Sequence, residues 1–146
     1  MHMMKAIVVE QSGSPEVLHI RQLHRPEADH GWVLVRIRAF GLNRSEMFTR
    51  QGFSPDVTFP RILGIEAVGE VEQDPSGHYS VKLTTYQSET LDMSTAVSVL
   101  QEYVTGVEHG TSRVRLDRVF KFEEIVEAHR YMESNAATGK LVVLVD

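Results

Sequence analysis

Histidine is the residue type in this 146-residue chain that could replace cysteine as a zinc ligand, because the chain holds seven histidines and no cysteine. Without cysteine the chain can form no disulfide, thiolate zinc site or cysteine nucleophile. His19, His24 and His30 are five and six residues apart, and they fall on an expected strand and the loop after it. A metal site needs ligands that converge on one point. We therefore interpret these histidines as solvated and expect no bound metal.

The serines and glycines form no familiar catalytic or phosphate-binding motif. No Gly-x-Ser-x-Gly occurs, so Ser45 is not expected to be a hydrolase nucleophile. The ten glycines never fall as Gly-x-Gly-x-x-Gly. Gly64 and Gly69 have the offset of the two P-loop glycines, but Glu70 and Val71 follow where Lys and Ser or Thr are required. The sequence therefore carries no turn suited to a pyrophosphate.

The first half of the chain has the pattern of β-strands. Apolar or alternating runs predict strands at residues 5–10, 17–23, 31–40 and 64–72. A short helix is expected at 43–50, with Met47 turned inward. Alternation in the 31–40 strand places one apolar set on the inner face and the arginines outside; that set is Val33, Val35, Ile37 and Ala39.

After residue 77 the pattern changes to strands and helices that alternate. Strands are expected at 81–86, 113–120 and 141–145. One helix should run from an N-cap at Asp92 to a stop at Gly110. A second helix at 123–134 carries His129 on its apolar stripe, where we expect a packed histidine rather than a base. The change near Gly77 is the one candidate junction.

The composition indicates a globular domain that binds neither nucleic acid nor membranes. The apolar fraction is 42% and the charged fraction 24%, close to globular averages. The formal net charge of -5 gives no attraction to a phosphate backbone. No apolar run approaches the length of about 20 residues that a bilayer requires. We expect a cytoplasmic protein.

Four segments in order resemble the medium-chain dehydrogenase superfamily, and within it the zinc-independent branch of quinone oxidoreductase-like enzymes. They lie at residues 4–18, 33–46, 59–71 and 118–144, the third with the Pro-x-x-x-Gly-x-Glu-x-x-Gly-x-Val pattern. The resemblance implies an α+β fold that is mainly β, a GroES-like partly open β-barrel. It implies one domain over residues 1–146, built from segments 4–77 and 81–146 that join near 77–80.

The resemblance also implies roles for individual residues. An Asn at the place of Asn43 lies beside the nicotinamide in this branch and can polarise a quinone or enone carbonyl. Thr85 and Tyr86 resemble a segment that contacts the cofactor, and Lys140 resembles a position near the cofactor phosphates. Zinc-dependent relatives have Cys near the place of Asn43 and His at the place of Ile65, so catalytic zinc is not expected.

Each of these residues also has a structural interpretation. Asn43 could cap the helix that follows it, and Lys140 could be a solvated surface lysine. Thr85 and Tyr86 could belong to an edge strand. Glu66 is more simply a carboxylate that accepts hydrogen bonds from loop amides than a catalytic acid.

The family places a Rossmann domain that binds NADPH between the two matching segments, and we expect this chain to lack that domain and to bind no cofactor. The chain would then be the catalytic-domain portion of an NAD(P)H-dependent quinone or enone oxidoreductase. It should be inactive alone, because proximity effects of about 7–11 kcal/mol are lost without a cofactor site. The alternative is a GroES-like binding or self-association module, which forms a homodimer through the exposed former domain interface.

Overall fold

The computed structural model describes residues 2–77 and 93–145. Along the chain it contains strands, α-helices and two 3-10 turns in the order β1 (Met3–Val9), η1 (Pro15–Val17), β2 (Leu18–His24), β3 (Leu34–Gly41), α1 (Arg44–Gln51), β4 (Arg61–Ile62), β5 (Val68–Gln73), α2 (Met93–Glu108), β6 (Leu116–Lys121), η2 (Phe122–Glu124), α3 (Ile125–Glu133) and β7 (Lys140–Leu144). The expected α+β class is confirmed: the described strands form one antiparallel and one mixed sheet, accompanied by few helices, and within the described residues they do not close into a barrel.

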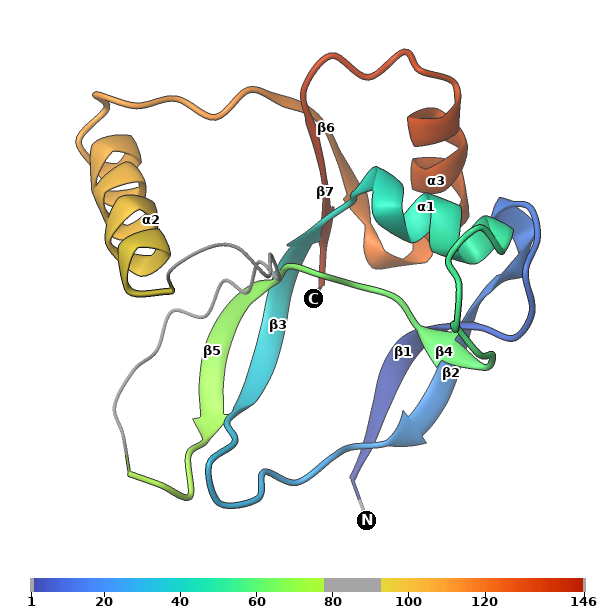
Figure 1. Ribbon diagram of the computed structural model, residues 1–146, viewed down its shortest axis with the longest axis horizontal. Coiled ribbons are helices and arrows are strands. Elements are labelled where there is room, and N and C mark those ends of the chain that lie inside the picture. Colours follow the sequence, from blue (N-terminus) through green and yellow to red (C-terminus); the bar gives the residue numbers. More distant parts are fainter. Residues whose placement is uncertain (1, 78–92, 146) are drawn as a thin grey trace.

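The larger of the two sheets contains strands from both halves of the chain, whereas the smaller contains strands from the first half alone (Figure 1). The smaller sheet has the order β2-β1-β4, with β1 antiparallel to both neighbours. The larger has the order β5-β3-β7-β6. β3 and β7 are antiparallel, with Gly41 opposite Val142, whereas β6 and β7 are parallel. The C-terminal segment thus completes the sheet that the N-terminal segment begins.

The core lies where α1 and α3 meet the strands. Met47 on α1 is buried, as the sequence predicts, and α3 packs against β7, β6 and η1. A contiguous apolar cluster fills this region: Val9, Leu18, Leu42, Met47, Phe120, Ile125, Ala128, Met132, Leu141 and Val143. Burial of these side chains is the main force that holds the two segments together.

A buried arginine joins α1 to α3. Arg50 is fully buried; its guanidinium forms an ion pair with Glu133 and donates to the Gly13 carbonyl. Its Nε donates to His129 Nδ1 at 3.4 Å. Burial and the charge of Arg50 lower the pKa of His129 to about 4. His129 is therefore neutral and packed at ordinary pH, as expected.

The structure corrects several expected elements. β5 begins at Val68 rather than at residue 64, and the short strand β4 was not expected. Ile37 is 42% exposed because the core cluster lies at the other end of β3, beyond Phe40. The expected strand at 81–86 and the N-cap at Asp92 lie outside the described residues.

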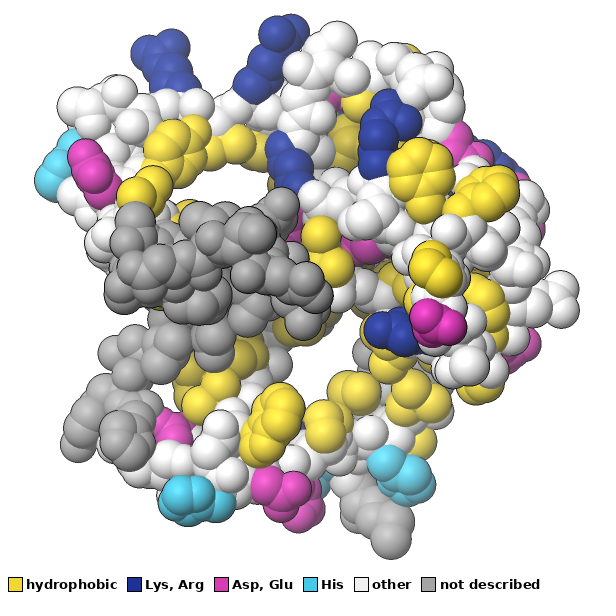
Figure 2. Space-filling view, in the orientation of Figure 1, with side chains coloured by type: hydrophobic (Ala, Val, Ile, Leu, Met, Phe, Trp, Pro, Cys, Tyr) yellow, Lys and Arg dark blue, Asp and Glu magenta, His cyan; other side chains and the backbone are white. Residues whose placement is uncertain are grey.

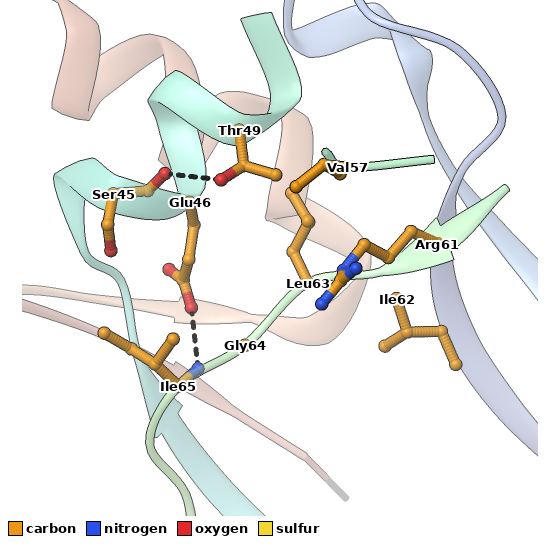
Figure 3. A pocket seen from close by; sticks show the side chains of 9 residues that line it. All are labelled: Ser45, Glu46, Thr49, Val57, Arg61, Ile62, Leu63, Gly64 and Ile65. Atoms are coloured by element: carbon orange, nitrogen blue, oxygen red, sulfur yellow. Dashed lines mark hydrogen bonds between the residues drawn. The ribbon is translucent and has the colours of Figure 1, made fainter. Parts of the chain in front are cut away.

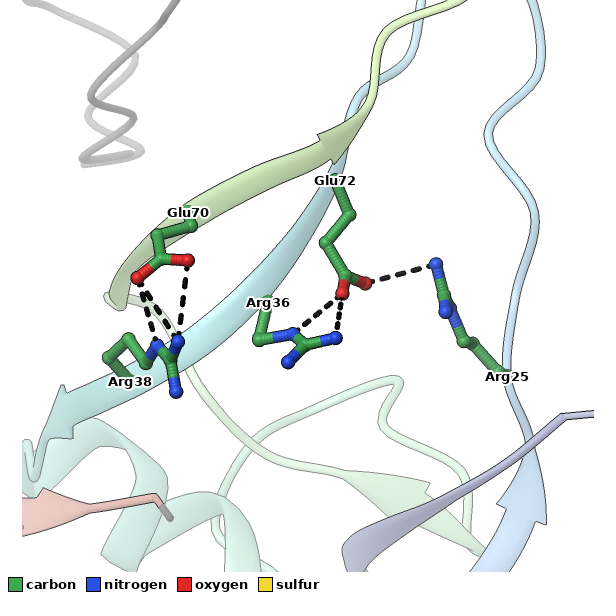
Figure 4. Close-up of polar contacts among 5 residues, drawn as sticks. All are labelled: Arg25, Arg36, Arg38, Glu70 and Glu72. Atoms are coloured by element: carbon green, nitrogen blue, oxygen red, sulfur yellow. Dashed lines mark hydrogen bonds and ion pairs between the residues drawn. The ribbon is translucent and has the colours of Figure 1, made fainter.

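The arginine side chains of β3 are exposed to solvent, as predicted, and they pair with acidic side chains of β5 (Figure 4). Arg38 forms a bidentate pair with Glu70, and Arg36 pairs with Glu72. Arg25 reaches the same Glu72 at 3.0 Å. Exposed pairs of this kind are worth little each, so we interpret them as fixing the strand pairing rather than as a ligand site.

Helix α2 stands apart from the two sheets (Figure 1) and leaves apolar side chains in solvent. Val97, Val99, Tyr103 and Val107 are each 42 to 61% exposed. Hydrophobic side chains are visible on this face of the molecule (Figure 2). Within the described part of the chain, no helix has the length and apolar character needed to cross a membrane.

Candidate functional site

Three polar side chains converge at the junction of β3, α1 and β7. Asn43 sits between β3 and α1, Lys140 begins β7, and Glu66 lies in the loop between β4 and β5. Pairing of β3 with β7 sets Gly41 opposite Val142, two residues beyond Lys140. The site therefore depends on both segments of the chain.

The three side chains bond to one another in a closed arrangement. Lys140 Nζ donates to Asn43 Oδ1 at 2.9 Å, and Asn43 Nδ2 donates to Glu66 Oε1 at 3.2 Å. Lys140 also forms an ion pair with Glu66. Because its oxygen and its nitrogen each have a charged partner, the Asn43 amide has a single favoured orientation.

Gly41 provides the space that this cluster occupies. A Cβ at Gly41 would stand 1.9 Å from Glu66 Oε1 and 2.4 Å from Lys140 Cε. Neither approach is compatible with van der Waals contact, so a side chain there would displace the ion pair. The present arrangement of Glu66 and Lys140 therefore uses the absence of a side chain at Gly41.

Glu46 holds the backbone next to the polar cluster in place. Its side chain is buried, and its two oxygens accept the backbone N–H groups of Asn43 at 2.9 Å and Ile65 at 3.2 Å. Burial raises the pKa of Glu46, the nearby charge of Glu66 acts in the same direction, and the two backbone donors oppose it. Glu46 therefore ties the start of α1 to the loop that carries Glu66.

A shallow pocket of about 130 Å³ opens beside Glu46 (Figure 3). It lies between α1 and the segment through β4, and it is lined by Ser45, Glu46, Thr49, Val57, Arg61, Ile62, Leu63, Gly64 and Ile65. Since Glu46 bonds the backbone of Asn43 and Ile65 precedes Glu66, the pocket adjoins the polar cluster.

The structure brings together two of the four site residues expected from the sequence. Asn43 and Lys140 are in direct contact, whereas Thr85 and Tyr86 lie outside the described residues. Glu66, which the sequence suggested as a partner of loop amides, instead accepts from Asn43 and Lys140. Glu46 was not anticipated, although the spacing of Asn43 and Glu46 is that of a capping box.

The residues present do not fit a zinc ion. Neither the Asn43 amide nor the Ile65 side chain, which the resemblance set at the positions of two zinc ligands, is a good zinc ligand. Among the described residues no group of three or more His, Asp or Glu side chains could hold a metal.

The βαβ-like unit within residues 2–77 and 93–145 does not fit a dinucleotide either. The parallel strands β6 and β7, with α3 between them, form the one βαβ-like unit of the described residues. The turn into α3 contains Glu123 and Glu124 and no glycine. Two carboxylates at the start of a helix would repel a pyrophosphate.

A family model described as a zinc-binding dehydrogenase matches residues 55–143, and the chain belongs to this family. It is a partial, quinone oxidoreductase-like member of the medium-chain dehydrogenase superfamily, as its motifs indicated. It is 41% identical over 70 residues to a quinone oxidoreductase of Pseudomonas aeruginosa, covering 48% of this chain and 22% of that protein. The chain spans about a fifth of the length of the curated relatives it matches.

Two solved structures share the fold over almost the whole chain. The human synaptic vesicle membrane protein VAT-1 homolog-like protein has a TM-score of 0.80 at 11% identity, with 99% of both chains covered. A quinone oxidoreductase from Coxiella burnetii has a TM-score of 0.77 at 14% identity, covering 99% of this chain and 100% of that one. At such identities the likeness concerns the fold alone.

Proposed function

We propose that this chain is the carbonyl-binding portion of a zinc-independent, NADPH-dependent quinone or enone oxidoreductase. The observation that carries the proposal is the orientation of Asn43. Its Oδ1 faces Lys140 and one N–H of Nδ2 faces Glu66, while an amide nitrogen has two donors. The second N–H is the group assigned to the substrate oxygen, where it would stabilise negative charge as that develops.

Lys140 and Glu66 are assigned to holding the Asn43 amide. Lys140 forms an ion pair with the Glu66 carboxylate and donates to the Asn43 amide oxygen. Because this carboxylate largely neutralises its charge, the ammonium would attract a phosphate only weakly. Its role near the cofactor phosphates, and that of Thr85 and Tyr86, is therefore proposed only for a protein with a nucleotide-binding domain. In that protein the domain would be inserted near residues 77–80, between two segments of one GroES-like domain.

This chain alone is proposed to bind a carbonyl compound weakly and to reduce nothing. NADPH supplies a hydride when bound, but the described residues offer no site for its pyrophosphate. Without that site the reactants cannot be held together, and proximity contributes nothing.

A second candidate function is self-association, and the exposed face of α2 favours it. Val99, Tyr103 and Val107 are four residues apart on this helix, so they share one side of it, and all three lie in solvent. Exposed apolar surface of this kind is typical of interfaces. On this proposal the chain is a non-catalytic module that forms a homodimer.

One pair of measurements tests both candidates. Titration of the 15N-labelled chain with cyclohexenone should shift the side-chain amide signal of Asn43, and Asn43→Ala should abolish binding while the exposed loop variant Gln11→Ala should not. NADPH consumption with a quinone should stay at the buffer rate. Consumption well above buffer that Asn43→Ala removes would contradict inactivity, and unchanged Asn43 signals would contradict the carbonyl site. Concentration-dependent dimers in size exclusion, without carbonyl binding, would favour the module.

A further inference from the structure

The pocket beside Glu46 has a largely apolar wall. Val57, Ile62, Leu63 and Ile65 give it an apolar lining, and Ile62 and Ile65 are 50% and 45% exposed. Half-exposed apolar side chains that line a concave surface gain free energy when a ligand covers them.

Arg61 supplies the positive charge of this pocket. Its backbone is fixed, because β4 pairs with β1 and sets Arg61 opposite Val9. Its side chain is exposed, and none of the ion pairs that join described residues involves it. An arginine without a carboxylate partner on an apolar wall has its donors available for an anion.

Glu46 does not neutralise Arg61. In Figure 3 the Glu46 carboxylate and the Arg61 guanidinium lie on opposite sides of the pocket. The two carboxylate oxygens of Glu46 are used by the backbone N–H groups of Asn43 and Ile65. Glu46 therefore holds the backbone on one side of the pocket, and Arg61 on the other side forms no ion pair with any described residue.

We propose that this pocket binds the anionic end of the substrate, so that the preferred ligand is a small carbonyl compound that also carries a carboxylate. The carbonyl oxygen lies toward Asn43 and the carboxylate toward Arg61, with the carbon chain over the apolar wall. This inference rests on the proposed function of Asn43 and adds the substrate class. Arg61 is the residue that determines specificity; it takes no part in the reaction.

The test uses the full 15N-labelled chain and two unreactive probes of equal size, levulinate and its neutral amide. Levulinate should shift the backbone signals of Ser45 and Ile65 with an affinity about two- to fivefold higher than that of the amide, because an ion pair with an exposed arginine adds only a modest amount to binding. Raising the salt concentration should reduce the difference, because the attraction is electrostatic.

Variants separate this inference from the proposed function. Arg61→Gln should remove the preference for levulinate, and Arg113→Gln, a change at another exposed arginine, should keep it. Asn43→Ala should weaken the binding of both probes by the same factor. Equal binding of the two probes, no binding of either, or an unchanged preference in Arg61→Gln would overturn the inference. A preference that depends on Arg61 with no effect of Asn43→Ala would overturn the role of Asn43 and leave the anion site standing.

Discussion

Lys140 Nζ donates to Asn43 Oδ1 at 2.9 Å although the two residues are 97 positions apart in the chain. The contact crosses from the N-terminal segment to the first residue of β7, in a sheet to which both segments contribute strands. The strand pairing that contributes Leu141 and Val143 to the core therefore also brings Lys140 to Asn43, so the polar cluster depends on the pairing of the two segments.

Removal of the Lys140 ammonium should free the Asn43 amide. In Lys140→Met the Asn43 oxygen loses its charged donor, and Glu66 is left without its cation. We expect the side-chain amide signals of Asn43 to move in NMR spectra, and unfolding in urea to show a loss of about 1 kcal/mol, small because the pair is about one-third exposed. Lys5→Met, which removes a fully exposed pair with Glu123, is the control and should leave the Asn43 signals in place.

Gly41→Ala should disturb the site through steric overlap. The added Cβ meets Glu66 and Lys140, so the ion pair must move, at a cost of about 1–3 kcal/mol in unfolding free energy. The cost should shrink when Gly41→Ala is made in a chain that already carries Glu66→Ala and Lys140→Ala. An equal cost in both backgrounds would show that the ion pair is not what the new methyl group meets.

His129 should make stability depend on pH between about 4 and 6.5. Its pKa is about 4 in the folded chain and near 6.5 when unfolded, so as the pH falls the unfolded chain takes up the proton first. Neutral His129 therefore contributes about 3 kcal/mol to the free energy of unfolding above pH 6.5, and this contribution is lost as the pH falls toward 4. Urea unfolding at pH 7.5 and pH 4.5 measures it.

The matched variants for this pH dependence are His129→Gln and His24→Gln. Glutamine retains an acceptor for Arg50 and cannot be protonated, so His129→Gln should flatten the pH dependence. His24 is exposed on β2, and its replacement should change little. The same slope in the wild-type chain and in His129→Gln would show that other groups cause it.

Zinc should leave the stability of the chain unchanged, despite the name of its family. Asn43 and Ile65 offer no thiolate or imidazole at the ligand positions that the superfamily uses, and the described residues hold no alternative cluster. We expect the melting temperature to be the same in EDTA and in a tenfold excess of Zn²⁺. A rise that EDTA reverses would refute the zinc-independent assignment.

Much of the fold follows from local patterns in the sequence. The apolar stripe of α3 and the inward Met47 were predicted correctly because helical periodicity reports a buried face directly. The exposure of Ile37 was not predicted. Alternation along β3 shows which side chains share a face of the strand, but it does not show whether anything packs on that face. In the site, Asn43 was indicated by its motif, whereas its contact with Lys140 depends on strand pairing far along the chain. Glu46 is explained by local capping chemistry, and only the structure shows that it also reaches Ile65.

Arg50 should prove the most sensitive polar residue of the chain. It is fully buried and bonds Glu133 on α3, the Gly13 carbonyl and His129. Arg50→Ala leaves a cavity, an acid without its cation and a carbonyl without its donor, so we expect a loss of about 3–5 kcal/mol in urea unfolding. Arg130→Ala, at an exposed arginine paired with Glu16, should cost less than about 1 kcal/mol. Adding Glu133→Gln to Arg50→Ala should recover part of the loss, because the unpaired negative charge is removed. If the two arginine variants cost the same, the buried network is not what joins α1 to α3.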